Sequence, residues 1–482
     1  MNLTKPIVVR EYDRIYGHDK KEQEREGQKV FISHKDYNDL ERFVKEFKSD
    51  EGNAIQFLFG MTGKYKYGKD DDFDEIDSFF SICKNYISVK NYVGTIQLPS
   101  GLKIDVLPKV IGDESLEFDI DAQKKTRDVF LKMLRSMTDF PFKVFEKADL
   151  SLYSMSLFDV FLYIYLLEVR ELSRRGLKSQ YLTEEDDLKF FRGKLMVREH
   201  IKRNVAHKER FYVEYDDYSL NRPENRLIKS ALEKLKRLVV HQTNKKLIYQ
   251  LLPHFEHVEI SVNYKKDFDK IVLDRTTKSR YENIILWTEL ILYNFGLNTF
   301  TGDRKATSIL FKMNDLFEAY IYKEFRKVAG EKGNRDIVKK GGFNKKHLFE
   351  SEFRDGICQN GKKFRLEPDI MVLESGSCRA LLDTKWKVLK WGEANHGVSN
   401  ADIYQMFAYS QKYDCNDIWL IYPKVPLENW EKSDGDYVKV MYEAELPDEK
   451  KVRIRIFFVD LFHIKGSMNS LVEEIISNTY KD

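Results

Sequence analysis

The chain has 482 residues, which is enough for two to four domains with substantial cores. Its 81 lysines and arginines nearly balance its 78 aspartates and glutamates, so the net charge of +3 does not by itself indicate a nucleic-acid-binding protein. The four cysteines contain no C-x-x-C pair, which argues against a zinc module and against a disulfide scaffold.

The N-terminal segment MNLTKPIVVREYDR lacks the apolar core of a signal peptide. No later apolar run reaches the roughly 18 residues of a membrane span. We therefore expect a cytoplasmic protein that does not enter a membrane.

Residues 1–115 predict a β-rich N-terminal domain that is interrupted by charged loops or insertions, at 18–29 and 64–77. Residues 92–110 predict two strands around the turn Pro99-Ser100-Gly101. Apolar and polar side chains alternate along the second of these strands, as expected for a strand with one buried face.

The segment GMTGKY, residues 60–65, has part of the pattern of a phosphate-binding loop. The full pattern requires a glycine five positions before Gly63 and a hydroxyl residue after Lys64. The chain has Leu58 and Tyr65 there, so we predict that it binds no nucleotide itself.

Residues 116–300 predict a mostly helical middle region. Residues 156–172 are apolar on nearly all sides, which is typical of a buried helix. Residues 221–239 predict a second helix, with Asn221 as its cap and Pro223 in its first turn.

Residues 188–210 carry eight basic and two acidic side chains. Such a basic segment can contact DNA phosphates. It can equally be a solvated face or a surface for an acidic protein partner, and we favour these two interpretations over DNA contact.

Residues 301–482 predict an α/β domain in the order helix, β-hairpin, helix, strand. Its first helix, at 314–328, has an apolar stripe with helical spacing. Strands are expected at 370–373, 379–388, 417–423 and 453–462, and a helix at 402–413.

The hairpin LEPDIMVLESGSCRALLDTKWKVL, residues 366–389, carries three polar side chains that a plain hairpin does not need. If its loop is residues 375–377, Asp369 and Asp383 are directly opposed, with Cβ atoms about 4.5–5.5 Å apart. Lys385 lies on the same face as Asp383, because side chains alternate with a period of two. The three side chains are therefore expected to converge.

Two carboxylates held this close repel each other, and a divalent cation would make the arrangement favourable. Carboxylate oxygens suit Mg²⁺, which is commonly held by one or two protein carboxylates together with substrate phosphate. A lysine beside such an ion can orient the attacking water. The alternative is an ordinary surface ion pair between Asp369 and Lys385 or a nearby arginine.

In the helix 402–413, Gln405 and Tyr409 share a face because they are four residues apart. The apolar side of this helix is expected to contain Ile403, Met406, Phe407 and Ser410.

Pro368-Asp369 opening one strand and Asp383-Thr384-Lys385 closing the next resemble the PD-(D/E)xK nuclease superfamily. In some of its members a Q-x-x-x-Y helix, matched here by Gln405 and Tyr409, packs beside the active site and positions the substrate or the lysine. The superfamily also implies a glutamate from the preceding helix in the metal site, and Glu318 is the candidate. The resemblance thus implies Asp369, Asp383 and Glu318 as Mg²⁺ ligands, with Lys385 as the fourth catalytic residue.

The order of further motifs narrows the resemblance to the McrC family, the nuclease subunits of McrBC-type, modification-dependent restriction systems. These motifs are V-G-x-I-x-L-P-x-G-x-x-I-x-V-L-P-K at 93–109, F-R-G-K-L at 191–195, N-R-L-I-K at 225–229 and L-F-E at 316–318. The charged first 80 residues depart from the family pattern.

The resemblance implies an endonuclease that cuts double-stranded DNA, often at methylated sites. It also implies docking to a ring of McrB-like AAA+ GTPases, which bind the GTP, and stimulation of their GTP hydrolysis. Docking is expected through the part of the chain before the nuclease domain. Because the chain holds one catalytic set, we expect a double-strand break to need a second copy of the complex. Two alternatives stay open: a non-catalytic adaptor that activates the motor, and a free-standing nuclease.

Overall fold

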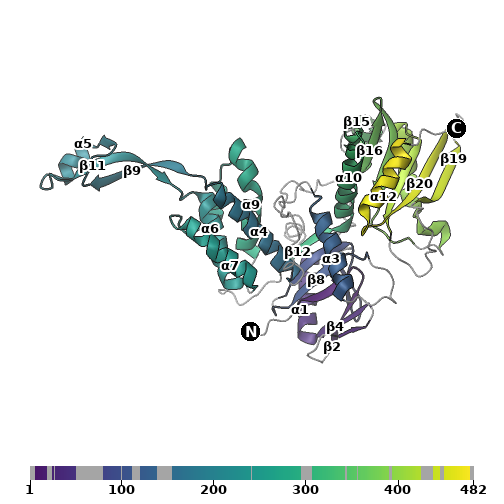
Figure 1. Cartoon of the computed structure of the whole chain (residues 1–482), viewed down its shortest axis with the longest axis horizontal. Helices are drawn as coiled ribbons and strands as arrows, with labels where there is room; N and C mark the ends of the chain where they lie inside the picture. Colours follow the sequence, from purple (N-terminus) through teal and green to yellow (C-terminus); the bar gives the residue numbers. More distant parts are fainter. Residues whose placement is uncertain are drawn as a thin grey trace. The chain divides into compact units, whose positions relative to one another are not determined.

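The computed structural model describes residues 6–18, 24–26, 28–49, 80–98, 100–110, 120–137, 155–239, 241–294, 307–341, 345–354, 357–389, 393–424, 438–445 and 450–477 (Figure 1). The chain forms two compact units. The first contains Met1–Phe59, Tyr65–Phe140 and Ser308–Asp482, and the second contains Gly60–Lys64 and Pro141–Thr307. The predicted mixture of helices and sheets is confirmed, whereas the domain boundaries predicted at residues 115 and 300 stay predictions.

The N-terminal part of the first unit contains two small sheets. One has the order β1-β8-β7-β12, in which β1 and β8 are parallel and β7 and β8 form the hairpin predicted around Ser100. The other has the order β3-β4-β2-β6-β5. The elements are β1 (Ile7–Arg10), β2 (Arg14–His18), β3 (Glu24–Glu26), β4 (Lys29–Ser33), α1 (His34–Ser49), β5 (Phe80–Ile82), β6 (Ile87–Val89), β7 (Tyr92–Gln97), β8 (Lys103–Leu107), α3 (Ile120–Leu134) and β12 (Thr307–Lys312).

The C-terminal part of the first unit is built on a six-stranded mixed sheet with the order β13-β16-β17-β18-β20-β19. Its centre is parallel, since β17, β18 and β20 run in one direction. Its strands are β13 (Val338–Lys340), β16 (Ile370–Glu374), β17 (Ser377–Thr384), β18 (Asp417–Pro423), β19 (Val438–Glu445) and β20 (Lys451–Val459).

Helices flank this sheet, and Figure 1 shows α10 and α12 beside it. Helix α10 contacts β17 and α12 contacts β20, while α11 packs against β14, β18 and β20. The apolar stripe predicted for α10 is buried as expected. The remaining elements are α10 (Met313–Glu331), the 3-10 helices Arg335–Ile337 and Ala394–Gly397, the hairpin of β14 (Lys346–Arg354) and β15 (Ile357–Leu366), α11 (Asn400–Tyr413), α12 (Ile464–Val472) and a π-helical turn at Glu473–Ser477.

The second unit is a helical bundle that carries a long β-hairpin. Helix α4 is buried on nearly all sides, as predicted, and its core is extended by the packing of Phe161 on Trp287. Helix α6 has Pro223 in its first turn, as predicted, but its cap position is Arg222 rather than Asn221, whose Oδ1 instead accepts a hydrogen bond from Glu259 N. The helices are α4 (Leu157–Arg174), α6 (Pro223–Leu238), α7 (Gln242–Leu251), the 3-10 helix Leu252–Phe255, α8 (Tyr264–Asp269) and α9 (Arg275–Asn294).

The hairpin of the second unit interrupts the region that the sequence predicted as mostly helical. Strands β9 (Gln180–Leu188) and β11 (Phe211–Ser219) pair over nine residues each, and the short β10 (Lys194–Leu195) and α5 (Val197–Arg203) follow at its far end. The basic segment 188–210 forms this end. The strands add acidic side chains, so residues 180–219 hold eight basic and nine acidic residues in all. Ion pairs such as Arg192–Asp217, at 3.0 Å, join the two kinds of charge.

No helix in the described part of the chain combines the length and the apolarity that crossing a bilayer requires.

Candidate active site

The register of the β16–β17 hairpin places the two predicted aspartates opposite each other. Ile370 pairs with Leu382, so the next positions outward are Asp369 and Asp383. The turn itself differs from the prediction. It has two residues, Ser375 and Gly376, both with positive φ, as in the tight turns that suit a twisted hairpin. A bulge between Val372 and Leu373 adds one residue to β17 and restores the predicted register.

Asp369 is anchored from the neighbouring strand. Its Oδ2 accepts a hydrogen bond from Thr384 N at 2.6 Å and one from Thr384 Oγ1 at 2.5 Å. Asp383 is almost fully buried, with 3% of its surface exposed. Both carboxylates are therefore held in fixed positions at the end of β17.

Lys385 connects Asp383 to helix α11. Its ammonium lies 2.7 Å from Asp383 Oδ2 and donates a hydrogen bond to Gln405 Oε1 at 2.9 Å. Gln405 Nε2 in turn donates to the Tyr409 hydroxyl at 3.0 Å, and this hydroxyl donates to the Glu367 carbonyl at 3.1 Å. The predicted residues Lys385, Gln405 and Tyr409 thus form one continuous chain of polar contacts.

Helix α11 is positioned for this by its caps and its buried face. Ser399 caps its first turn by accepting a hydrogen bond from Asp402 N, and Asp414 ends it in the left-handed conformation. Met406 and Ser410 are buried as predicted. Phe407 was predicted to be buried but is 38% exposed, since the buried face of the helix is formed by Met406, Tyr409, Ser410 and Tyr413 and Phe407 lies at its edge.

Glu318 comes from helix α10 and lies partly buried. Its Oε1 pairs with Lys340 Nζ of strand β13 at 3.2 Å. Its negative charge acts on both Asp369 and Asp383, which places it near the two aspartates. Its predicted role as a metal ligand stays a prediction.

Residues 87–423 match the family model of the McrBC 5-methylcytosine restriction system component. The match covers more than half of the chain.

The chain belongs to the McrBC family.

The predicted resemblance is thereby confirmed. The fold is similar to that of a chain in the half-complex from a tetradecameric assembly of Thermococcus gammatolerans McrB AAA+ hexamers with bound McrC. The two chains are 17% identical with a TM-score of 0.62, over 98% of this chain and 100% of that chain. A chain of the Thermococcus gammatolerans McrBC complex matches with a TM-score of 0.45 and 19% identity, over 67% of this chain and 88% of that chain. No curated protein matches the chain.

Electrostatic repulsion is strong at the site of this McrBC-family chain. Desolvation raises the pKa of Asp369 well above its usual range, and the charges of Asp383 and Glu318 raise it further. Desolvation also raises the pKa of Asp383, although the neighbouring Lys385 opposes this shift. The pKa of Glu318 is raised by desolvation as well, against the effect of Lys340. These carboxylates favour an added positive charge between them.

Lys385 keeps its proton firmly. Desolvation lowers its pKa, but the charges of Asp383, Asp402 and Asp369 together outweigh this effect, and the net shift is upward. Lys385 is therefore a stable cation rather than a base at neutral pH.

The donor set of this McrBC-family chain fits a hard divalent cation that is held by two carboxylates. Asp369 and Asp383 offer oxygen atoms only, and their raised pKa values indicate charge that a cation would neutralise. Among the described residues, no three His, Cys, Asp or Glu side chains come together closely enough to hold an ion jointly. A Mg²⁺ ion here would thus take its remaining ligands from water and substrate phosphate.

Two residues of the site were not predicted. Asp402 Oδ1 lies 3.9 Å from the Lys385 ammonium, and Thr384 holds Asp369 through its hydroxyl and its backbone. A signal for Asp402 was present, because it precedes Gln405 by three residues and so lies on the same face of α11. No sequence pattern marks Thr384, whose hydroxyl is seen to matter only once the register is known.

Proposed function

We propose that this McrBC-family chain is the endonuclease subunit of a GTP-dependent restriction complex and that it hydrolyses DNA phosphodiester bonds with Mg²⁺. The observation that carries the proposal is the geometry at the end of β17. Asp369 and Asp383 are opposed across the hairpin, and the Lys385 ammonium is held 2.7 Å from Asp383 and 2.9 Å from Gln405. An acidic pair beside a fixed cation suits a reaction in which negative charge develops on phosphate oxygens.

Each residue then has a distinct role. Asp369 and Asp383 would hold the Mg²⁺ ion, with Glu318 assisting through the negative charge that it adds nearby rather than as a third direct ligand. When bound, Mg²⁺ supplies a positive charge that polarises the phosphate and lowers the pKa of water. Lys385 orients the attacking water and stabilises the charge that develops in the transition state, a role that suits a lysine that stays protonated.

Gln405 and Tyr409 act through Lys385. Gln405 accepts a hydrogen bond from the ammonium, and Tyr409 accepts one from the Gln405 amide. Because Tyr409 is also tied to the Glu367 carbonyl, the lysine is held in one orientation. Pre-organisation of this kind removes the need to order the cation during the reaction.

The proposed partner is a ring of McrB-like AAA+ GTPases. The support is the membership of the McrBC family and the similarity to a chain from an assembly of McrB hexamers with bound McrC. The sequence contains no phosphate-binding loop, so the GTP would be bound by the partner. Docking would use the part of the chain before the nuclease, and the DNA would be double-stranded, with methylated cytosine as a candidate mark.

The test is a cleavage assay with the co-purified GTPase partner, double-stranded DNA, GTP and Mg²⁺. Asp383→Ala should abolish cutting and leave stimulation of GTP hydrolysis intact. Lys385→Ala should keep metal binding while cleavage falls by orders of magnitude, because the lysine acts mainly in the transition state. Normal cutting by Asp383→Ala would show that the site is misassigned. If the unmodified chain stimulates GTP hydrolysis but never cuts DNA, the result favours the non-catalytic adaptor. If it cuts DNA with Mg²⁺ in the absence of the GTPase partner, the result favours the free-standing nuclease.

A further inference from the structure

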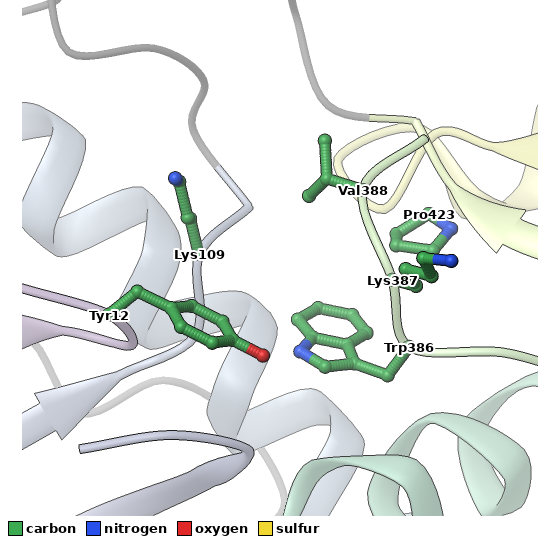
Figure 2. Close-up of a pocket in the computed structure, with 6 residues that line it drawn as sticks. All are labelled: Tyr12, Lys109, Trp386, Lys387, Val388 and Pro423. Atoms are coloured by element: carbon green, nitrogen blue, oxygen red, sulfur yellow. The ribbon is translucent and has the colours of Figure 1, made fainter. Parts of the chain in front are cut away.

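A pocket of 190 Å³ opens in the first unit. It is lined by Tyr12, Lys109, Trp386, Lys387, Val388 and Pro423, all within the first unit. Figure 2 shows the hydroxyl end of the Tyr12 phenol pointing towards the Trp386 indole, with Lys109 above Tyr12. Trp386 directly follows Lys385, so one wall of the pocket is the chain neighbour of the proposed catalytic lysine.

The pocket lies where the carboxyl ends of two pairs of parallel strands meet. Tyr12 and Lys109 each follow the end of a strand in the β1–β8 pair by two residues. Trp386 follows the end of β17 by two residues, and Pro423 ends its parallel neighbour β18. In open α/β sheets, ligands bind preferentially outside the carboxyl ends of the strands.

Tyr12 is held in a conformation that bulky residues rarely adopt. Its φ is 68°, yet its side chain is 38% exposed, so packing of the ring does not account for the strain. Hydrogen bonds hold the loop in place, from Tyr12 N to the Val89 carbonyl at 2.8 Å and from the Tyr12 hydroxyl to Asn91 Oδ1 at 2.5 Å. Strain of this kind concentrates at ligand-binding positions.

Trp386 forms a fixed wall of the pocket. Its indole nitrogen donates a hydrogen bond to the buried Glu11 Oε2 at 3.0 Å, and its ring packs edge-on against Phe317 at 5.3 Å between centroids. Lys109 N donates to the same Glu11 oxygen at 3.1 Å. The buried carboxyl of Glu11 thus positions both the Trp386 ring and the backbone of Lys109.

We propose that this pocket binds one nucleotide of the DNA strand that flanks the scissile phosphodiester. The base would stack against Tyr12 and Trp386, since aromatic side chains accept any base face. The Lys109 ammonium would pair with a phosphate of the same strand. Lys387 already donates to the Gly397 carbonyl at 2.9 Å, so the phosphate contact is assigned to Lys109. This inference rests on the proposed function and extends it to the substrate strand.

The stacking contact is tested by binding of duplex DNA to the full chain assembled with its GTPase partner, with Asp383→Ala present to prevent cutting. Single abasic sites are moved one position at a time along a strand. Loss of one base near the cleavage position should weaken binding about tenfold, and Tyr12→Leu should weaken binding of intact DNA by a similar factor. In the Tyr12→Leu protein, that abasic site should cause no further loss of DNA affinity. The Tyr12→Phe protein should bind DNA as tightly as the protein that keeps Tyr12. If Tyr12→Leu and the abasic site weaken binding independently at every position of the abasic site, so that their factors multiply, the stacking contact does not exist.

The phosphate contact is tested by the salt dependence of the same binding. Lys109→Ala should reduce the slope of log affinity against log salt by about 0.9, as expected for one lost phosphate contact. Lys124→Ala is the matched control, because Lys124 is an exposed lysine on α3 that pairs with Asp121. An unchanged slope in Lys109→Ala would overturn the assignment.

A cleavage assay on intact DNA with the unmodified chain, which keeps Asp383, tests the proposed nuclease function separately from the proposed nucleotide pocket. If that protein cuts DNA while the abasic and salt results fail, only the pocket assignment falls. If it does not cut, the proposed function falls, and the binding results still decide whether the pocket holds a nucleotide.

Discussion

Lys385 and Gln405 are joined by a hydrogen bond of 2.9 Å, although Lys385 follows strand β17 and Gln405 lies on helix α11. This bond ties the proposed catalytic cation to the helix that covers the sheet. A hydrogen bond to a charged group contributes about 1.5–3 kcal/mol. We expect Gln405→Ala to slow single-turnover DNA cleavage by roughly 10- to 100-fold, with Mg²⁺ affinity unchanged. Gln411→Ala, an exposed change on the same helix, is the control, and equal rates for the two variants would contradict this role.

Glu11 makes stability depend on pH. Burial raises its pKa to about 8 from the ordinary value of 4.5, against the opposing effects of its hydrogen bonds with Lys109 and Trp386 and of the Lys109 charge. An acid with a raised pKa binds its proton more tightly in the folded state. The folded state therefore loses stability as pH rises from about 4.5 to about 8, and the loss is complete above pH 8.

Glu11→Gln keeps an acceptor for Trp386 and for Lys109 N but cannot ionise. The unmodified chain should lose up to about 5 kcal/mol of unfolding free energy as pH rises from 4.5 to 8, and the variant should not lose it. The variant should therefore be the more stable of the two, relative to their difference at pH 4.5, by that amount at pH 8. The measurement is the difference in unfolding free energy between the two proteins across this pH range. A difference that does not change with pH would show that Glu11 is not titrating there.

The glycine of the F-R-G-K-L segment, Gly193, is required by the local structure. Its φ is 73°, and a Cβ atom would lie 2.3 Å from the Glu214 carbonyl oxygen of strand β11. Gly193→Ala should therefore distort the end of the β9–β11 hairpin, at a cost of about 1–3 kcal/mol from backbone strain alone. If the partner docks on the chain before the nuclease, GTPase stimulation should fall several-fold.

Gly176→Ala is the control for this change, because Gly176 also has a positive φ, of 86°, but nothing lies within 4 Å of an added Cβ atom. The measurement is GTP hydrolysis by the partner at saturating concentrations of each variant. Full stimulation by Gly193→Ala would show that the end of the hairpin is not needed for activation.

Under the proposed function, one Asp369–Asp383–Lys385 set would cut one strand at a time, so we expect a double-strand break to require two copies of the complex. Mixing the unmodified chain with Asp369→Ala should produce nicked DNA in a fraction that rises with the share of the variant. Complete linearisation by an assembly that contains one copy, without rebinding, would contradict this expectation.

The opposition of Asp369 and Asp383 was predictable because register depends on the hydrophobic alternation as well as on the turn. The turn is one residue shorter than predicted, and a bulge at Arg379 compensates for it. Nothing in the local sequence identifies that bulge. The agreement of the register therefore reflects the requirement to bury Ile370 and Leu382 on the correct faces of the sheet.

The features that could not be predicted depend on contacts between distant segments. Phe407 lies at the edge of the apolar stripe of α11 and is exposed, whereas Tyr409 is buried and its hydroxyl donates a hydrogen bond to the Glu367 carbonyl. The hydrogen bond between Glu11 and Trp386 joins residues 375 positions apart. Periodicity describes one element at a time and carries no information on such pairs.

The insertion of the second unit into the first has a consequence for synthesis on the ribosome. Strand β7 pairs with β12, which is made only after the residues of the entire second unit. Until then, the nascent chain exposes an unpaired sheet edge at β7, a recognised risk for aggregation. At that stage the residues of the second unit are complete, whereas the N-terminal sheet still lacks its edge strand β12. We therefore expect chaperone dependence during synthesis to be concentrated in the N-terminal sheet.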